Sequence, residues 1–88
     1  MFRGVKHSDW STDHIARHGV TLDEVREALL ERPHYQAKGR NETILIYGRT
    51  AEGRHLLVVA VDDHGAAFVV TARDMTPSEK KTFARKAR

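Results

Sequence analysis

The chain has 88 residues and a mass of 10.0 kDa, so its length fits a single domain (residues 1–88) with a small core. Hydrophobic residues make up 40% of the chain and charged residues 31%, and no apolar run approaches the roughly 20 residues that cross a bilayer, which indicates a globular chain rather than a disordered or membrane-spanning one. The absence of cysteine excludes disulfides, thiolate catalysis and cysteine-ligated metal, and the opening MFRGVKHSDW lacks the apolar run of a signal peptide, so we expect a cytoplasmic protein.

The segment after the first eight residues has the pattern of a short helix. Residues 9–18 are predicted to be helical, with Trp10 and Ile15, and His14 beside them, turned toward the core. Gly19 follows as the C-terminal cap, because glycine accepts the left-handed backbone conformation more readily than any other residue.

A second helix is predicted within TLDEVREALLERP, residues 21–33. Thr21 and Glu24 have the spacing of a capping box, in which each side chain accepts a hydrogen bond from the other residue's backbone amide. Leucine and valine then recur at helical spacing, and Pro33 ends the helix because a residue before proline avoids the helical conformation.

The middle of the chain changes to the apolar spacing of strands. Three segments rich in β-branched and aromatic residues, ETILIYGR (42–49), RHLLVVAVD (54–62) and AAFVVTAR (66–73), are separated by the short turns TAEG and DDHG, which predicts antiparallel hairpins. HYQAK (34–38) is a candidate edge strand. The run Leu56–Val61 is apolar on both faces, so we expect this strand to lie centrally with both sides covered.

The last helix has the clearest start in the chain, with Thr76 as N-cap, Pro77 in the first turn and Glu79 completing a capping box. The order of elements predicts an α+β fold with N-terminal helices, an antiparallel meander sheet of three to four strands and a C-terminal helix. This last helix is basic: residues 80–88 hold five of the 15 Lys and Arg and no acid, whereas the other residues hold ten cations against 12 acids. Nucleic acid, an acidic partner protein or simple solvation would each fit this charge.

Several catalytic classes find little support. His14 and His18 have the i, i+4 spacing that puts two imidazoles on one helix face, but no third ligand stands at a suitable spacing, so we expect no metal site. No serine has the glycine-flanked setting of a catalytic nucleophile, and no glycine-rich phosphate loop is present. We therefore expect neither a metal nor an organic cofactor.

Cationic and titratable side chains gather near the strand ends. Alternation along the last strand predicts one face carrying Val69, Thr71 and Arg73, and an opposite face carrying Phe68, Val70 and Ala72. By the same rule Tyr47 and Arg49 share a face, as do His55, Leu57 and Val59. Two arginines, a tyrosine and a histidine are therefore expected to meet at one end of the sheet.

Such a cluster suits RNA cleavage without a metal. The ribose 2′-hydroxyl attacks its own phosphate, so the protein supplies only a proton acceptor, a proton donor and positive charge. The simpler alternative is that Arg73 pairs with Asp74 or another nearby carboxylate and only holds the turn between the last strand and the last helix.

Three stretches in the chain resemble the BrnT family, the toxins of a bacterial toxin–antitoxin system. HIARHGVTLDEVREAL resembles the family's lysine-histidine-glycine-valine segment and the helix after it, with Arg17 in the lysine position. GRTAEGRHLLVV resembles its glycine-containing turn and central strand. VVTARDMTPSEKKTF resembles its closing strand, its serine-alanine-arginine signature and its last helix, so that the similarity extends from His14 to Phe83.

The resemblance implies a RelE-like fold and a ribonuclease toxin that cleaves RNA without a metal and blocks translation and growth. It implies a ribbon-helix-helix antitoxin (BrnA-like) as partner, possible assembly as a homodimer or a heterotetramer with that antitoxin, and binding of operator DNA by the complex. On this basis we expect Arg73 to stabilise phosphate charge, with His55 as acid and base and with Arg49 or Arg40 assisting. The cations expected to follow the RNA backbone are Lys80, Lys81 and Arg85.

Three positions depart from the family's pattern. The usual tryptophan-aspartate pair of an N-terminal strand is out of register here, although Trp10 lies nearby. Two positions where the family commonly has arginine hold Thr43, with Arg40 the nearest substitute, and Phe68. These departures keep two other hypotheses open: a catalytically inactive module that binds nucleic acid or antitoxin in operon regulation, and a protein whose basic helix docks on an acidic partner protein.

Overall fold

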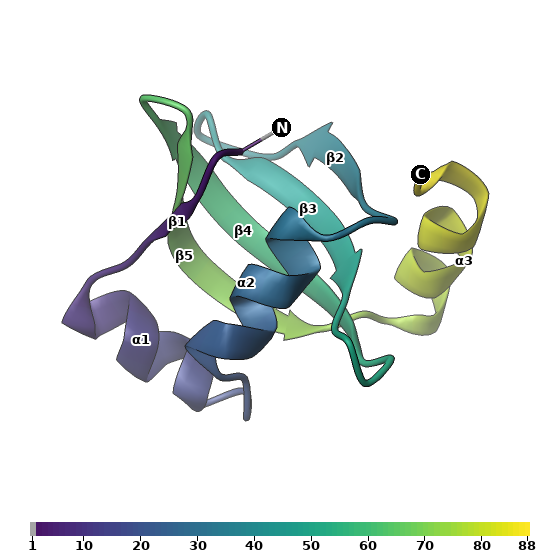
Figure 1. Cartoon of the computed structure of the whole chain (residues 1–88), viewed down its shortest axis with the longest axis horizontal. Helices are drawn as coiled ribbons and strands as arrows, with labels where there is room; N and C mark the ends of the chain where they lie inside the picture. Colours follow the sequence, from purple (N-terminus) through teal and green to yellow (C-terminus); the bar gives the residue numbers. More distant parts are fainter. Residues whose placement is uncertain (1) are drawn as a thin grey trace.

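Five strands and three helices make up the part of the chain that the structure, a computed structural model, describes, namely residues 2–88 (Figure 1). In chain order they are β1 (Val5–Lys6), α1 (Asp9–Ala16), α2 (Leu22–Leu30), β2 (Tyr35–Lys38), β3 (Ile44–Arg49), β4 (His55–Asp63), β5 (Ala66–Asp74) and α3 (Pro77–Lys86). The predicted α+β architecture, with two helices before an antiparallel meander and one helix after it, is confirmed.

The strands form one sheet in the order β1-β5-β4-β3-β2, with antiparallel pairing from β2 through β5. The apolar strand β4 is the central one and β2 lies at an edge, as the sequence predicts. The structure adds β1 at the other edge, where Val5 and Lys6 pair in parallel with Ala67 and Phe68. Two residues are too few to show alternation, so the sequence pattern did not reveal this strand.

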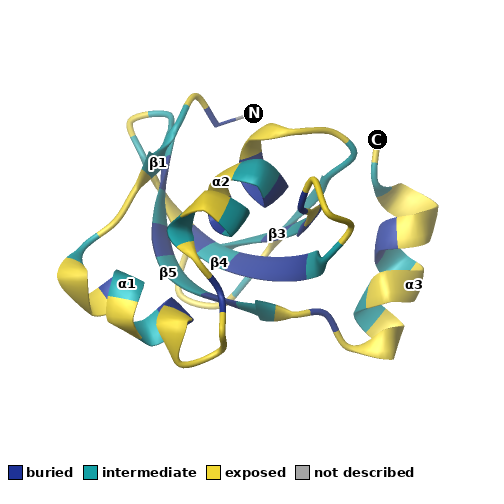
Figure 2. Ribbon diagram, turned by 60° about the horizontal axis from the view of Figure 1, so that its bottom comes forward, coloured by how far each residue is buried: buried dark blue, intermediate teal, exposed yellow. Residues whose placement is uncertain are grey.

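Helices α1 and α2 lie on one face of the sheet, here called the α2 face. The main core lies between these helices and the sheet (Figure 2). Each large aliphatic side chain buried there stabilises the fold by roughly 1.5–3 kcal/mol. Helix α2 approaches β3 so closely that Gly48 lies against the backbone of Ala28. The buried apolar residues of this core are Phe2, Ile15, Val20, Val25, Ala28, Leu29, Ile46, Leu56, Val58, Ala60, Ala67, Val69 and Ala72.

A β-bulge in β5 changes which residues share a face. Val59 pairs with Thr71 while the next residue of β4, Ala60, pairs with Val69, so Val70 is an extra residue without a partner in β4. An extra residue reverses the alternation, because side chains in a strand alternate with a period of two. Val69 therefore points into the main core, and the prediction that it shares a face with Arg73 was wrong.

All three helices begin with the hydrogen bonding of a capping box, as predicted for α2 and α3. Thr21 and Glu24 exchange hydrogen bonds at the start of α2, and Thr76 and Glu79 do so at the start of α3. The N-cap of α1 is Ser8, whose capping-box partner is a second serine. Each such cap stabilises its helix by about 1 kcal/mol.

The first helix ends earlier than predicted, at Ala16 rather than His18, with Gly19 in the predicted left-handed conformation at a φ of 70°. Its buried positions are Ser11 and Ile15, four residues apart, because this is the stripe that meets the sheet. Trp10 lies outside that stripe and is 62% exposed, so the prediction that it turns inward was wrong. Its ring instead stacks on His14, with ring centroids 4.9 Å apart.

Arg54, directly before β4, joins three segments that are distant in sequence. Its guanidinium donates hydrogen bonds to the carboxylates of Glu24 on α2 and Asp74 on β5, at 3.1 Å and 2.7 Å. It also donates to the carbonyl oxygen of Gly19, at 2.8 Å. The pKa of Asp74 is lowered chiefly by the hydrogen bond from Arg54, and the pKa of Glu24 is lowered chiefly by the hydrogen bond from the backbone amide of Thr21, with Arg54 contributing. Both carboxylates are therefore ionised partners at neutral pH.

We expect Arg54→Met to lower the free energy of unfolding by about 2 kcal/mol, because it leaves two carboxylates and a carbonyl oxygen without their donor in a partly buried place. The matched control is Arg26→Met, since Arg26 makes one exposed ion pair with Asp23 at 3.4 Å, and a change within about 0.5 kcal/mol is expected there. Urea denaturation of both variants is the measurement. Equal midpoints would show that the Arg54 network contributes nothing to stability.

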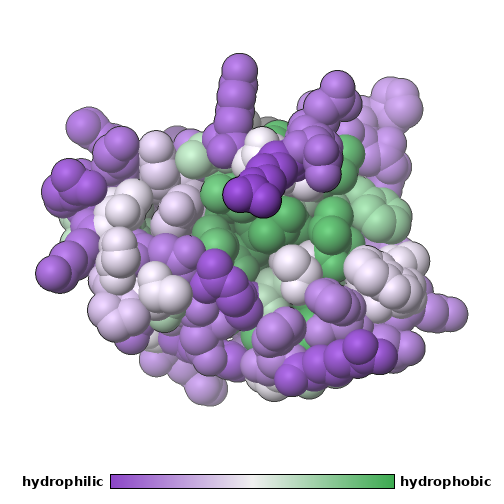
Figure 3. All heavy atoms as spheres, turned by 180° about the vertical axis from the view of Figure 1, so that it is seen from behind, coloured by the Kyte–Doolittle hydropathy of each residue, from purple (hydrophilic) through white to green (hydrophobic). Residues whose placement is uncertain are grey.

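Helix α3 lies on the opposite face of the sheet, here called the α3 face, and covers only one end of it. Phe83 of α3 is buried there with Leu57 and Met75, beside Leu45 and Tyr47. The rest of this face is open, and apolar surface is visible on it in the view from behind (Figure 3). The expectation that both sides of β4 are covered therefore holds only at the end near α3.

Within residues 2–88 none of the helices combines the length and the apolar character needed to cross a membrane.

Candidate active site

The α3 face brings together most of the side chains predicted to act on phosphate. Across the sheet, Arg73 of β5 pairs with Leu57 of β4, which pairs with Tyr47 of β3. Two residues along these strands, His55 of β4 pairs with Arg49 of β3. Paired positions share a face, and diagonal neighbours lie about 7–8 Å apart, so the four polar side chains lie at one end of one face. This convergence, expected from the sequence, is confirmed.

Phe83 of α3 is the apolar residue around which this end is organised. The ring of His55 meets it edge to face, with centroids 5.3 Å apart and an interplanar angle of 89°. The guanidinium carbon of Arg49 lies 6.0 Å from the same ring centroid. Phe83 therefore holds both side chains in place without using their hydrogen-bonding atoms.

The environment of His55 favours the neutral imidazole. Burial lowers the pKa of His55 below its usual 6.5, and the positive charges of Lys80 and Arg49 lower it further. At neutral pH the ring therefore carries a free lone pair on one nitrogen and can accept a proton. A neutral imidazole surrounded by cations is the arrangement that a general base needs beside an anionic substrate.

Arg73 is held by a carboxylate, as the simpler alternative proposed. Its two terminal nitrogens donate to the two carboxylate oxygens of Glu79, at 2.7 Å and 2.9 Å, and one of them also donates to the carbonyl oxygen of Asp74 at 3.0 Å. This pairing lowers the pKa of Glu79 and raises that of Arg73. The contact joins the end of β5 to the first turn of α3.

Arg73 is nevertheless not sealed inside the molecule. Its side chain is 40% exposed, and within residues 2–88 its Nε–H and one of its Nη2 protons have no acceptor. A guanidinium has five donors, so a structural pair on one side leaves donors for a phosphate on the other. The geometry is consistent with both roles predicted for this residue.

Arg40 is the predicted catalytic residue that the structure keeps apart. It lies in the loop between β2 and β3, next to the end of β3 that begins with Ile44, whereas Arg49 is at the opposite end of β3. The five residue steps from Ile44 to Arg49 span about 16 Å. Arg40 therefore lies away from His55, and the expectation that it assists at this site is corrected.

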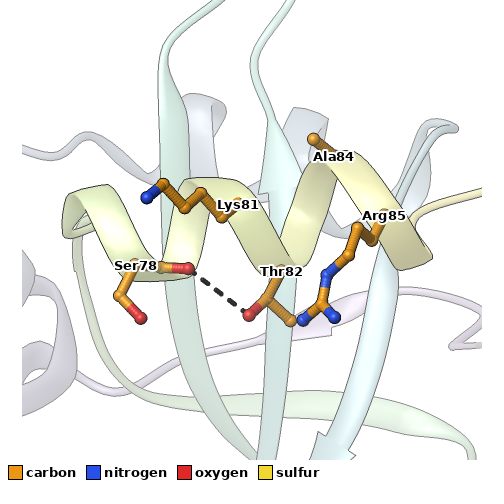
Figure 4. Close-up of a pocket in the computed structure, with 5 residues that line it drawn as sticks. All are labelled: Ser78, Lys81, Thr82, Ala84 and Arg85. Carbon is orange, nitrogen blue, oxygen red and sulfur yellow. Dashed lines mark hydrogen bonds between the residues drawn. The ribbon is translucent and has the colours of Figure 1, made fainter.

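The three cations predicted to follow RNA lie on two sides of α3. Lys80 is near His55, whose pKa it lowers. Lys81 and Arg85 instead line a hollow of about 510 Å³ on the outward side of the helix (Figure 4). All residues lining this hollow belong to one helix, so it is an open surface rather than an enclosed pocket, and it is separate from the His55 cluster. The lining residues are Ser78, Lys81, Thr82, Ala84 and Arg85.

Two residues of the site were not predicted from the sequence to belong to it. Glu79 was assigned to a capping box and to the helix that resembles the family's, but not to a pair with Arg73, although it lies six residues after Arg73, a spacing that allows a pair across the turn. Phe83 follows Glu79 by one helical turn and so faces the sheet with it. That spacing was the available signal in both cases.

The site thus offers a proton acceptor at His55, several cations and a phenol at Tyr47. Among residues 2–88 no three His, Asp or Glu side chains are grouped closely enough to hold a metal ion.

A search of family models, of curated proteins and of solved structures found no match to this chain.

Proposed function

We propose that this chain is a metal-independent endoribonuclease that acts as the toxin of a type II toxin–antitoxin system. The observation that carries the proposal is the meeting of a neutral His55 with Arg49, Lys80 and Arg73 at the end of the α3 face that α3 borders, where Arg73 is still 40% exposed. The resemblance to BrnT toxins in the sequence supports the biological part of the proposal. It also supports a small ribbon-helix-helix antitoxin as partner, operator DNA as a ligand of their complex, and a block of translation as the effect.

In the proposed reaction the RNA supplies its own nucleophile. The imidazole of His55 takes the proton of a ribose 2′-hydroxyl, and the 2′ oxygen attacks the adjacent phosphorus. The bond from phosphorus to the 5′ oxygen of the next nucleotide breaks, and that oxygen takes a proton from water or from a donor on this face, Tyr47 or Lys80. The products are a 2′,3′-cyclic phosphate and a 5′-hydroxyl.

The cations stabilise the charge that develops on the phosphate oxygens. Arg49 and Lys80 are close enough to His55 to affect its pKa, so they are close to a phosphate whose ribose His55 contacts. Arg73, on the same face as His55, keeps donors that Glu79 leaves free and that are available to the same group. Preorganised charge of this kind reduces the barrier more than equal charge in water, because the site is only partly solvated.

Purified protein is expected to cleave single-stranded RNA in the presence of EDTA and to leave 2′,3′-cyclic phosphate ends. Because His55 must be neutral, we expect kcat/KM to be level near neutrality and to fall with acid, with a midpoint below the usual histidine pKa of 6.5. Initial rates on a fluorogenic RNA over about pH 5 to 8 measure this. Lys80→Met removes a nearby cation and is expected to move the midpoint upward.

Absence of cleavage in EDTA, with RNA binding intact, would contradict the nuclease and leave a second candidate function. This is a module that binds RNA or antitoxin without cleaving, and the pairing of Arg73 with Glu79 is the observation that favours it. Binding by such a module would weaken with salt according to the number of phosphates contacted. A midpoint at or above 6.5 would contradict His55 as the base.

A further inference from the structure

The open part of the α3 face begins where α3 ends its cover of the sheet. Val61 of β4 is 38% exposed, and Val59 and Phe68 are partly exposed on the same face. The apolar surface seen from behind in Figure 3 lies over these strands. An uncovered apolar sheet face continuous with a cationic cluster is unusual for a surface that only meets water.

Phe68 is the aromatic residue of this open area. It pairs with Val61 of β4 on one side and with Lys6 of β1 on the other. Because of the bulge at Val70, it faces the same side of the sheet as Arg73, five residues further along β5. Strand geometry puts the two roughly 13–17 Å apart.

The charges around this face fit a polyanion. Helix α3, which borders it, carries four Lys and Arg, of which Lys80 lies on the side of His55, and a single acid, Glu79, which is paired with Arg73. Arg49 adds positive charge at the same border, and Arg73 adds hydrogen-bond donors that Glu79 leaves free. Asp63, near Phe68, is paired with Lys6 at 3.1 Å and with His64 at 2.8 Å. An apolar sheet surface with cations at its border suits single-stranded nucleic acid, whose bases are apolar on their faces and whose phosphates are anionic.

We propose that the open α3 face is the binding track for single-stranded RNA and that Phe68 stacks one base of the substrate, roughly two or three nucleotides from the scissile phosphate. This inference rests on the proposed function, because it takes the His55 end of the face as the place of cleavage. It assigns the substrate class as unpaired RNA, since a duplex cannot present a base face to the sheet. It also assigns a subsite to a position where the resembled family commonly has arginine.

The test measures binding separately from cleavage. A fluorescent six-nucleotide 2′-O-methyl RNA has no free 2′-hydroxyl and cannot be cut, and its affinity is read by fluorescence anisotropy in EDTA. Phe68→Ala is expected to weaken binding on the order of tenfold. Phe68→Leu keeps an apolar side chain but loses the ring, and is expected to weaken binding nearly as much. Trp10→Ala is the control, because Trp10 is an exposed aromatic on α1, away from this face.

An abasic series identifies the stacked base. Removing one base at a time is expected to reveal a single position at which wild type and Phe68→Ala bind equally. Circular dichroism melts of both Phe68 variants check that they are folded. If Phe68→Leu binds as well as wild type, or if Phe68→Ala does not change affinity, the stacking proposal is overturned.

The outcomes separate this proposal from the proposed function and from a protein-binding surface. Binding that depends on Phe68 without cleavage of natural RNA would contradict the nuclease activity and support the binding track. Cleavage of six-nucleotide substrates that does not depend on Phe68 would contradict the binding track and support the nuclease activity. Sedimentation that shows self-association of wild type, lost in Phe68→Ala with RNA affinity unchanged, would overturn the track in favour of contact between copies.

Discussion

His55→Gln is expected to lower kcat/KM for RNA cleavage by about 100-fold or more, because glutamine cannot take up the proton of the 2′-hydroxyl. The acid limb of the pH profile is expected to disappear in this variant, since that limb reports the protonation of His55. Initial rates on the fluorogenic RNA at several pH values measure both effects. Affinity for 2′-O-methyl RNA is expected to change by less than about threefold, because the main contacts to phosphate come from cations.

The control for this variant is His14→Gln. His14 lies on α1, where it stacks on Trp10, and is not part of the α3 face. A substitution there is expected to leave kcat/KM and its pH profile unchanged. Full activity of His55→Gln with an unaltered acid limb would show that another group accepts the proton. A loss of activity with a large drop in melting temperature would indicate a structural role beside Phe83 instead.

Gly48→Ala is expected to lower the free energy of unfolding by about 3 kcal/mol or more. Gly48 is buried in β3, and a Cβ atom there would overlap the carbonyl group of Ala28 on α2, which is backbone and cannot turn aside. The helix would have to move off the sheet and open the main core, which is close-packed. For a domain of this size the melting temperature is expected to fall by roughly 12 °C or more.

Gly4→Ala is the matched control for the core contact. Nothing lies within 4 Å of a Cβ atom built at Gly4, so the same chemical change is expected to alter stability by less than about 0.5 kcal/mol. Thermal and urea unfolding of the two variants measure the difference. A Gly48→Ala protein as stable as wild type would mean that α2 does not pack against β3 as closely as the structure has it.

The candidate site was partly predictable because strand alternation is a local property. His55, Arg49 and Tyr47 were placed on one face correctly, since β3 and β4 pair without irregularity. For β5 the reasoning failed at Val70, because a bulge is a property of pairing between strands and has no signature in the alternation of one of them. The prediction that Arg40 lies near His55 failed for a related reason. Closeness in sequence to a strand does not show which end of the sheet a loop reaches.

Local sequence by itself determined where the helices of this protein begin and which segments form the four strands β2 to β5. Capping boxes such as Thr76 with Glu79 use atoms within one turn, and apolar periodicity is written along each segment, so both are set by neighbouring residues. Only the tertiary structure decided that Glu79 also holds Arg73, that Arg54 joins α2 to β5, and that part of one sheet face stays open beside a cationic helix. These features depend on strand register and on how helices pack across the sheet, which are contacts between residues far apart in the chain.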